Sequence, residues 1–88
     1  YTDIGQYEQG LSIDIKLAEL RPTDETVFYN LACSYALLNM KNEAFRALAK
    51  AINLGYKDYR HLNQDADLSN LRPDARFEQI RSLLRGML

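Results

Sequence analysis

The chain has 88 residues, and its 11 basic and 12 acidic side chains leave a formal net charge of −1 at pH 7. Such a balance gives no electrostatic reason to expect nucleic acid or an anionic membrane surface as a partner. The longest apolar stretch, around residues 31–38, is far shorter than the roughly 18 residues of a membrane span. We therefore expect one small domain with a thin core, and neither a membrane nor a nucleic-acid role.

The chain holds one cysteine, Cys33, and one histidine, His61. A single cysteine excludes an internal disulfide, and a single histidine cannot complete a zinc site alone. No basic segment followed by an apolar stretch precedes the first predicted helix, so no secretion signal is visible within these residues. We expect no cofactor and no metal, and a reducing compartment, the cytoplasm.

The first predicted helix covers about residues 6–20, and a firm boundary follows it. Pro22 closes this segment, and Thr23 and Asp24 offer side-chain oxygens to the first amides of a helix that begins near Glu25. Within this second helix, apolar side chains recur every three or four residues along one stripe. The stripe predicts the buried face, and its members are Phe28, Leu31, Ala32, Tyr35 and Leu38.

A turn and a third helix come next. Asn39 stands where a left-handed backbone conformation is tolerated best. The two periodic segments and the short turn between them predict an antiparallel helical hairpin. The apolar residues of the third helix are Ala44, Phe45, Leu48, Ala51 and Ile52.

From residue 59 onward the pattern predicts shorter helices. Asp65 or Asp67 can cap a first turn, and Pro73 with Asp74 marks the start of a last helix. The apolar side chains of this region would close the end of the core: Leu68, Leu71, Phe77, Ile80, Leu83 and Leu84.

Shifting the sequence against itself by 34 residues reveals an internal repeat, because that offset is the length of one helix pair. The next shift places Asp65 on Leu31, so the match ends there. This register predicts that the chain begins near the end of the first helix of its first unit, which would leave the face around Ile4, Tyr7 and Leu11 open to solvent. The matched pairs are Tyr1 with Tyr35, Gly5 with Asn39, Gly10 with Ala44, Leu11 with Phe45, Leu20 with Leu54, and Asp24 with Asp58.

With these residues in place, the segment 25–58 resembles a tetratricopeptide repeat. Tyr56 replaces the closing proline of that family, and Asp14 and Leu17 depart from its preferred residues in the first unit. The stretch 65–77 resembles the tail that ends many bacterial arrays of these repeats. The positions that match the complete repeat are Phe28, Leu31, Ala32 and Tyr35 in its first helix and Ala44, Leu48 and Ala51 in its second.

The resemblance implies an all-α fold in which antiparallel helix hairpins stack as a short right-handed superhelix with a C-terminal capping helix. It divides the single domain into a truncated repeat at residues 1–24, a complete repeat at 25–58, and a degenerate repeat with its cap at 59–88. A terminal element of this kind covers the last apolar face of an array.

No residue pattern indicates catalysis. Cys33 and His61 lie in different units, without a protease or triad signature around either. Asp65, Asp67 and Asp74 each precede an apolar helical run, where helix capping explains them better than general acid–base chemistry does. We therefore expect that the chain is not an enzyme.

Four arginines of the last segment recur at four- to five-residue spacing, with acidic residues between them. This pattern predicts a solvated face more strongly than a nucleic-acid contact. They are Arg72, Arg76, Arg81 and Arg85.

In tetratricopeptide repeats the first helix of each pair lines a concave groove that binds peptides or partner helices. Tyr29 and Asn30 also lie off the apolar stripe, which predicts that they face outward. Asn30 matches an asparagine that helps to hold a peptide carboxylate in some members, or it satisfies neighbouring backbone groups. Leu71 and Ala75 replace the basic residues of a full carboxylate clamp. By this resemblance the groove residues are Thr26, Tyr29, Asn30, Cys33, Leu37, Arg60, Asn63 and Gln64.

We predict a protein-interaction scaffold that binds a peptide or partner protein through this concave face. One alternative is a regulatory or substrate-presenting tail of an enzyme whose catalytic domain lies upstream. Another is a self-association module that forms a homo-oligomer, since exposed repeat faces carry open apolar surface. A kinase, protease or transferase signature before Tyr1 would favour the first alternative, and concentration-dependent sedimentation the second.

Overall fold

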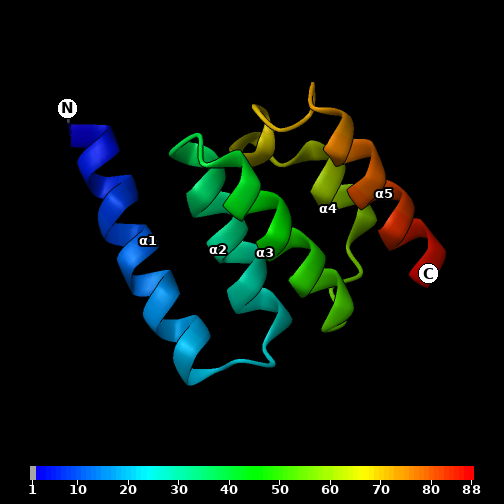
Figure 1. Cartoon of the computed structure of the whole chain (residues 1–88), viewed down its shortest axis with the longest axis horizontal. Helices are drawn as coiled ribbons and strands as arrows, with labels where there is room; N and C mark the ends of the chain where they lie inside the picture. Colours follow the sequence, from blue (N-terminus) through cyan, green and yellow to red (C-terminus); the bar gives the residue numbers. More distant parts are fainter. Residues whose placement is uncertain (1) are drawn as a thin grey trace.

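The computed structural model describes residues 2–88, with side chains from residue 5 onward. Every regular element within these residues is helical, so the all-α prediction is confirmed, and none of these helices is long and apolar enough to cross a membrane. The helices lie side by side in a flat assembly of 38 × 30 × 19 Å (Figure 1). In chain order the elements are α1 Thr2–Leu20, α2 Glu25–Leu37, α3 Lys41–Asn53, α4 Tyr59–Gln64, the 3₁₀ helix η1 Ala66–Leu68, and α5 Ala75–Met87.

Aspartate side chains begin four of these elements. Asp24 accepts a hydrogen bond from the backbone N–H of Thr26 at 2.9 Å at the start of α2. Asp58, Asp65 and Asp74 cap α4, η1 and α5 in the same way. An N-cap carboxylate satisfies amides that have no partner within the helix. The caps predicted at Asp24, Asp65 and Asp74 are thereby confirmed.

The predicted hairpin forms from α2 and α3. Asn39 has a φ of 59° in the left-handed region, and the N–H of Met40 donates to the carbonyl of Tyr35 at 2.8 Å to close the turn. Gly55, with a φ of 119°, ends α3 in a conformation that side chains other than glycine adopt only with strain. Both turns therefore depend on residues that tolerate positive φ.

The core lies between α2, α3 and the C-terminal elements. α1 packs on α2, η1 packs on α2, and α5 packs on α3 and α4. Leu31 and Ala32 of the predicted stripe are buried, while Phe28 and Tyr35 are partly buried against them. Each fully buried large apolar side chain contributes about 1.5–3 kcal/mol. The largest are Phe77, Leu48, Ile52, Leu62, Leu68, Leu71 and Leu84.

α1 differs from the helix predicted for residues 6–20. It runs through Gly5 without a break, so the turn that Gly5 was expected to share with Asn39 does not form. Glycine permits a left-handed turn but does not require one, and the residues that follow it form helices readily. Gly10 is only half-buried where Ala44 is fully buried, so the 34-residue offset does not place these two residues in equivalent surroundings.

Exposed apolar side chains remain on α1, on more than one side of the helix, because Ile13 and Ile15 are only two residues apart. Tyr7 and Leu11 are half-buried, whereas Ile13, Ile15 and Leu20 are 59%, 37% and 77% exposed. Two residues named in the sequence-based expectation, Tyr1 and the side chain of Ile4, lie outside the described part of the chain.

α3 and α5 begin and end 34 residues apart, but they bury different faces. The self-match ends at Asp65 because the six-residue α4 stops there, whereas α2 continues through the matching Leu31. The buried residues of α5 are Phe77, Ile80 and Leu84, and the unburied residues 34 positions before them are Glu43, Arg46 and Lys50.

Candidate functional site

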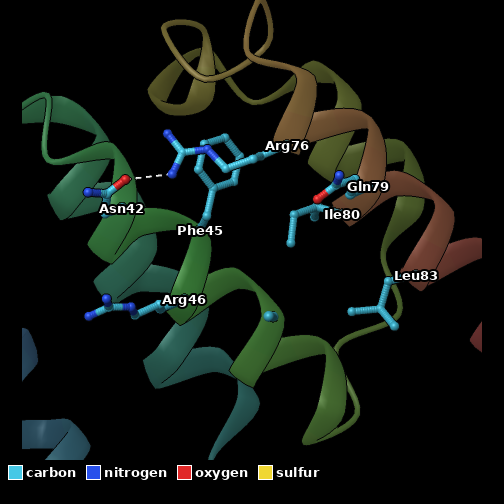
Figure 2. A pocket seen from close by; sticks show the side chains of 8 residues that line it. Asn42, Phe45, Arg46, Arg76, Gln79, Ile80 and Leu83 are labelled. Atoms are coloured by element: carbon cyan, nitrogen blue, oxygen red, sulfur yellow. Dashed lines mark hydrogen bonds between the residues drawn. The ribbon is translucent and has the colours of Figure 1, made fainter.

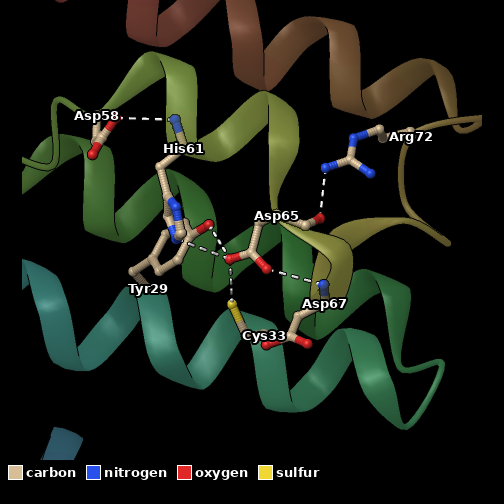
Figure 3. A network of polar contacts seen from close by, with 7 residues as sticks. All are labelled: Tyr29, Cys33, Asp58, His61, Asp65, Asp67 and Arg72. Carbon is tan, nitrogen blue, oxygen red and sulfur yellow. Dashed lines mark hydrogen bonds and ion pairs between the residues drawn. The ribbon is translucent and has the colours of Figure 1, made fainter.

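The eight residues that the resemblance implies for a groove do not form one open surface. The expectation that Tyr29 faces outward is wrong, because Tyr29 and Cys33 are only 5% and 8% exposed, whereas Asn30 is exposed as expected. The chain between Tyr56 and η1 lies on this face of α2 and covers both buried side chains (Figure 3). Of the other members, Thr26, Arg60 and Gln64 are exposed, and Leu37 and Asn63 are half-buried.

One carboxylate lies at the centre of this covered face. The Tyr29 hydroxyl donates to Asp65 Oδ2 at 2.7 Å, and the Cys33 thiol donates to the same oxygen at 3.7 Å. His61 Nε2 lies 3.2 Å from Oδ2, a contact that becomes an ion pair when the imidazole is protonated. The backbone N–H of Asp67 donates to Oδ1 at 2.9 Å. We call these five residues the Asp65 cluster; it joins α2, α4 and η1 (Figure 3).

Aromatic contacts strengthen the same junction. The ring of Tyr29 stacks on that of Tyr56 with centroids 4.4 Å apart and planes 9° apart. The His61 ring is 5.6 Å from Tyr29 at a tilted angle. Tyr29 therefore contacts the segment between Tyr56 and Asp65 through both its ring and its hydroxyl.

Burial sets the protonation of the cluster. Burial raises the pKa of Tyr29, and the hydrogen bond to Asp65 adds to the rise. Burial also raises the pKa of the Cys33 thiol, with the Asp65 charge adding to it, and raises the pKa of Tyr56 to about 12. For Asp65, burial opposes ionisation, but the hydrogen bonds from Tyr29 and Asp67 outweigh it and lower the carboxyl pKa. At neutral pH a phenol and a thiol therefore surround an ionised carboxylate.

Cys33, Asp65 and Asp67 bring three potential metal ligands together, with candidate atoms within 4.8 Å of one another. A cysteine binds metal as the thiolate, whereas burial and the neighbouring carboxylate keep the proton on Cys33. The Asp65 carboxylate also has donors from the protein on both oxygens. This geometry fits an internal hydrogen-bonded contact better than a metal centre or an activated nucleophile.

A groove of about 550 Å³ lies between α3 and α5, and none of the eight predicted residues lines it. Figure 2 shows the Phe45 ring of α3 beside the Arg76 guanidinium at the end where Asn42 and Arg76 meet, and Ile80 and Leu83 of α5 projecting toward α3. We call this surface the α3–α5 groove. Its lining consists of Asn42, Phe45, Arg46, Ala49, Arg76, Gln79, Ile80 and Leu83.

Arg76 closes one end of the α3–α5 groove. Its guanidinium pairs with Asp74 at 2.9 Å, donates to the side-chain oxygen of Asn42, and lies 4.6 Å from the centroid of the Phe45 ring. Hydrogen bonds from Arg76 lower the pKa of Asp74 to about 2. Asp74 also caps α5, so one carboxylate fixes both the start of α5 and this end of the groove.

A second, smaller hollow of about 320 Å³ lies between α2 and α3. Arg46 lines both hollows, so they are neighbours on the surface of α3. The other residues that line the smaller hollow are Phe28, Leu31, Tyr35, Glu43, Ala47 and Lys50.

The sequence-based prediction of a solvated arginine stripe is only partly right. Arg85 is exposed, but Arg72, Arg76 and Arg81 are half-buried. The guanidinium of Arg81 lies 5.1 Å from the centroid of Phe77, and Arg76 covers Phe45. Spacing alone cannot show which aromatic rings lie beneath a row of cations, and for that reason the α3–α5 groove was missed.

Comparison with known proteins adds a distant relative. The chain is similar to a chloroplastic protein of Arabidopsis thaliana, with 33% identity over 79 residues that cover 86% of this chain and 24% of that protein. No protein-family model matches the chain, and no solved structure matches it. The chain spans about a quarter of the length of the curated relative that it matches.

Proposed function

We propose that the chain is a tetratricopeptide-type helical module that binds a segment of another protein. The α3–α5 groove carries this proposal, because it offers an apolar floor between two helices with polar groups at its edges. The α2–α3 hairpin and its packing against α1 and α5 support the repeat architecture.

The chemistry of the buried polar groups favours binding over catalysis. Cys33 is the strongest nucleophile by residue type, but it is buried and its raised pKa keeps it protonated. Asp65 accepts hydrogen bonds from α2 and η1 and has His61 of α4 beside it, which leaves it poorly placed to exchange protons with a substrate.

The site we propose differs from the concave face that the resemblance implies. Tyr29 and Cys33, at the centre of that face, are covered by Tyr56, His61 and Asp65. Thr26, Asn30 and Arg60 remain exposed there and form the competing surface.

Site-specific photo-crosslinking in the full-length protein, inside its own cells, tests these surfaces. A photoreactive amino acid at Ala49 probes the α3–α5 groove, one at Asn30 probes the competing surface, and one at Lys57, an exposed loop residue, is the control. We expect one partner to crosslink strongly from Ala49 and weakly from the other two positions. Strong crosslinks from Asn30 alone would move the site to α2, and equal crosslinking from all three positions would contradict a binding module.

Self-association is a second candidate, favoured by the exposed Ile13, Ile15 and Leu20 of α1. Sedimentation of the chain over a range of concentrations tests it. A monomer at every concentration would contradict this alternative and leave the partner-binding proposal in place.

We also propose a cytoplasmic location, on the basis of the single reduced cysteine. The relative is named as chloroplastic, which supports the plastid as the alternative. Imaging of a fluorescent fusion of the full-length protein distinguishes the two.

A further inference from the structure

The floor of the α3–α5 groove forms a continuous apolar strip. Phe45 and Ile80 line it at 7% exposure each, and Leu83 stands further along α5 at 38%. Met87, one helical turn beyond Leu83, is 46% exposed. The lining residues run from Asn42 to Ala49 on α3 and from Arg76 to Leu83 on α5, so the trough is about 12 Å long, enough for about two turns of a partner helix.

The apolar floor of the groove suits a helix better than an extended peptide. An extended peptide would lay unpaired backbone N–H and C=O groups over an apolar floor, which costs free energy. A helix satisfies those groups internally and presents only side chains. Asn42 and Gln79 stand at the edges, and Asn42 already accepts a hydrogen bond from Arg76.

The charge of the lining is positive. It contains two arginines and no carboxylate. Asp74 offsets the charge of Arg76, whereas Arg46 is exposed and makes no ion pair or hydrogen bond within residues 5–88. Lys50 lies one turn beyond Arg46 on α3, and Glu43 lies one turn before it. An unpaired cation therefore stands beside the middle of the apolar floor.

We propose that the α3–α5 groove binds an acidic amphipathic helix of a partner protein. Apolar side chains on one face of that helix pack between Phe45, Ile80 and Leu83, and a Glu or Asp beside that face pairs with Arg46. This inference rests on the proposed function and adds the chemical class of the partner to it.

Fluorescence anisotropy with three designed helical peptides tests the inference on the full-length protein. All three carry the same leucine stripe; the flanking positions are Glu in the first, Gln in the second and Lys in the third. We expect the Glu peptide to bind most tightly, the Lys peptide most weakly, and the Glu peptide to weaken as salt is added.

Two variants assign the binding to the groove. Arg46→Gln should weaken the Glu peptide up to about fivefold and leave the Gln peptide unchanged. Leu83→Ser should weaken both peptides by about tenfold, because it removes apolar floor. Lys57→Gln is the control, since it removes one positive charge from an exposed position outside both the groove and the competing surface. Circular dichroism confirms that each variant keeps its helices.

The outcomes separate the two proposals. Equal binding of the Glu and Gln peptides, with both lost in Leu83→Ser, would overturn the acidic preference and keep the groove as a binding site. Stronger binding of the Lys peptide would overturn it likewise. Failure of all three peptides to bind, together with no crosslinks from either Ala49 or Asn30, would overturn the proposed function itself. Competition by a peptide of α1, with dimers in sedimentation, would replace the partner by a second copy.

Discussion

Tyr29 is the residue whose surroundings depart most from the sequence-based expectation. It lies off the apolar stripe of α2, yet its ring stacks on Tyr56 and its hydroxyl donates to Asp65. The two partners come from residues far along the chain, so helical periodicity cannot reveal them. A polar tip on a large apolar ring allows such a residue to be buried on a face that appears solvated in the sequence.

Tyr29→Phe tests the hydroxyl alone. The substitution keeps the stacked ring but leaves Asp65 without one of its donors, which should lower the free energy of unfolding by about 1–3 kcal/mol. Urea unfolding measures this change. Tyr59→Phe is the matched control, because the Tyr59 hydroxyl makes no hydrogen bond within the described residues, and its loss should change stability by less than about 0.5 kcal/mol. Equal changes in the free energy of unfolding for the two substitutions would contradict a stabilising hydrogen bond from Tyr29 to Asp65.

Alkaline pH tests the burial of the tyrosines. The pKa of Tyr56 is raised from an ordinary value of 10.0 to about 12, and that of Tyr29 is raised as well. The unfolded chain loses these protons first, so the stabilisation is complete below pH 10 and is lost as pH rises toward 12. Urea midpoints across this range should fall, and the fall should be smaller in Tyr56→Phe. An unchanged fall in that variant would mean that another group controls alkaline unfolding.

At the scale of the elements, helix starts were well predicted because an aspartate cap acts within three residues of itself. Asp24, Asp65 and Asp74 were identified from local sequence, and the hairpin turn at Asn39 likewise. The apolar face of α5 was predicted, and Phe77, Ile80 and Leu84 are buried as expected. The cover over α2 and the α3–α5 groove were not predicted, because both depend on packing between distant segments.

Asp74→Asn tests whether the two roles of the Asp74 carboxylate, capping α5 and pairing with Arg76, can be separated. Asparagine caps a helix about as well as aspartate, so Asp74→Asn should keep the start of α5 and remove only the charge facing Arg76. The stabilisation from a carboxylate with a lowered pKa is present above its ordinary value of 3.8 and is lost as pH falls toward about 2. Thermal unfolding between these pH values should depend less on pH in the variant. The same pH dependence in both proteins would contradict the pairing.

At the scale of the whole molecule, one thin core supports a flat layer of helices. Its fully buried residues come from α2, α3, α4, η1, α5 and, with Leu71, the connection between η1 and α5, while α1 contributes only partly buried side chains such as Leu11 and Ala18. Stability should therefore depend far more on the α2–α3 hairpin and the C-terminal elements than on α1.

Leu48→Ala tests this distribution. Leu48 is fully buried in α3, and its truncation should lower the free energy of unfolding by about 2–5 kcal/mol. Ile13→Ala on α1 removes a comparable apolar group at a position that is 59% exposed, and should cost less than about 1 kcal/mol. Urea unfolding compares the two, and a larger loss in Ile13→Ala would mean that α1 is buried in solution.

The contacts around Asp65 have a consequence for the order in which the chain assembles. The bonds from Tyr29 and Cys33 to Asp65 span 36 and 32 residues, whereas the hairpin turn closes over five. Nearby segments meet sooner, because closing a short loop costs less entropy. We therefore expect the hairpin of α2 and α3 to form first and to serve as the template on which the short α4 and η1 segments, too brief to hold a helix alone, become ordered.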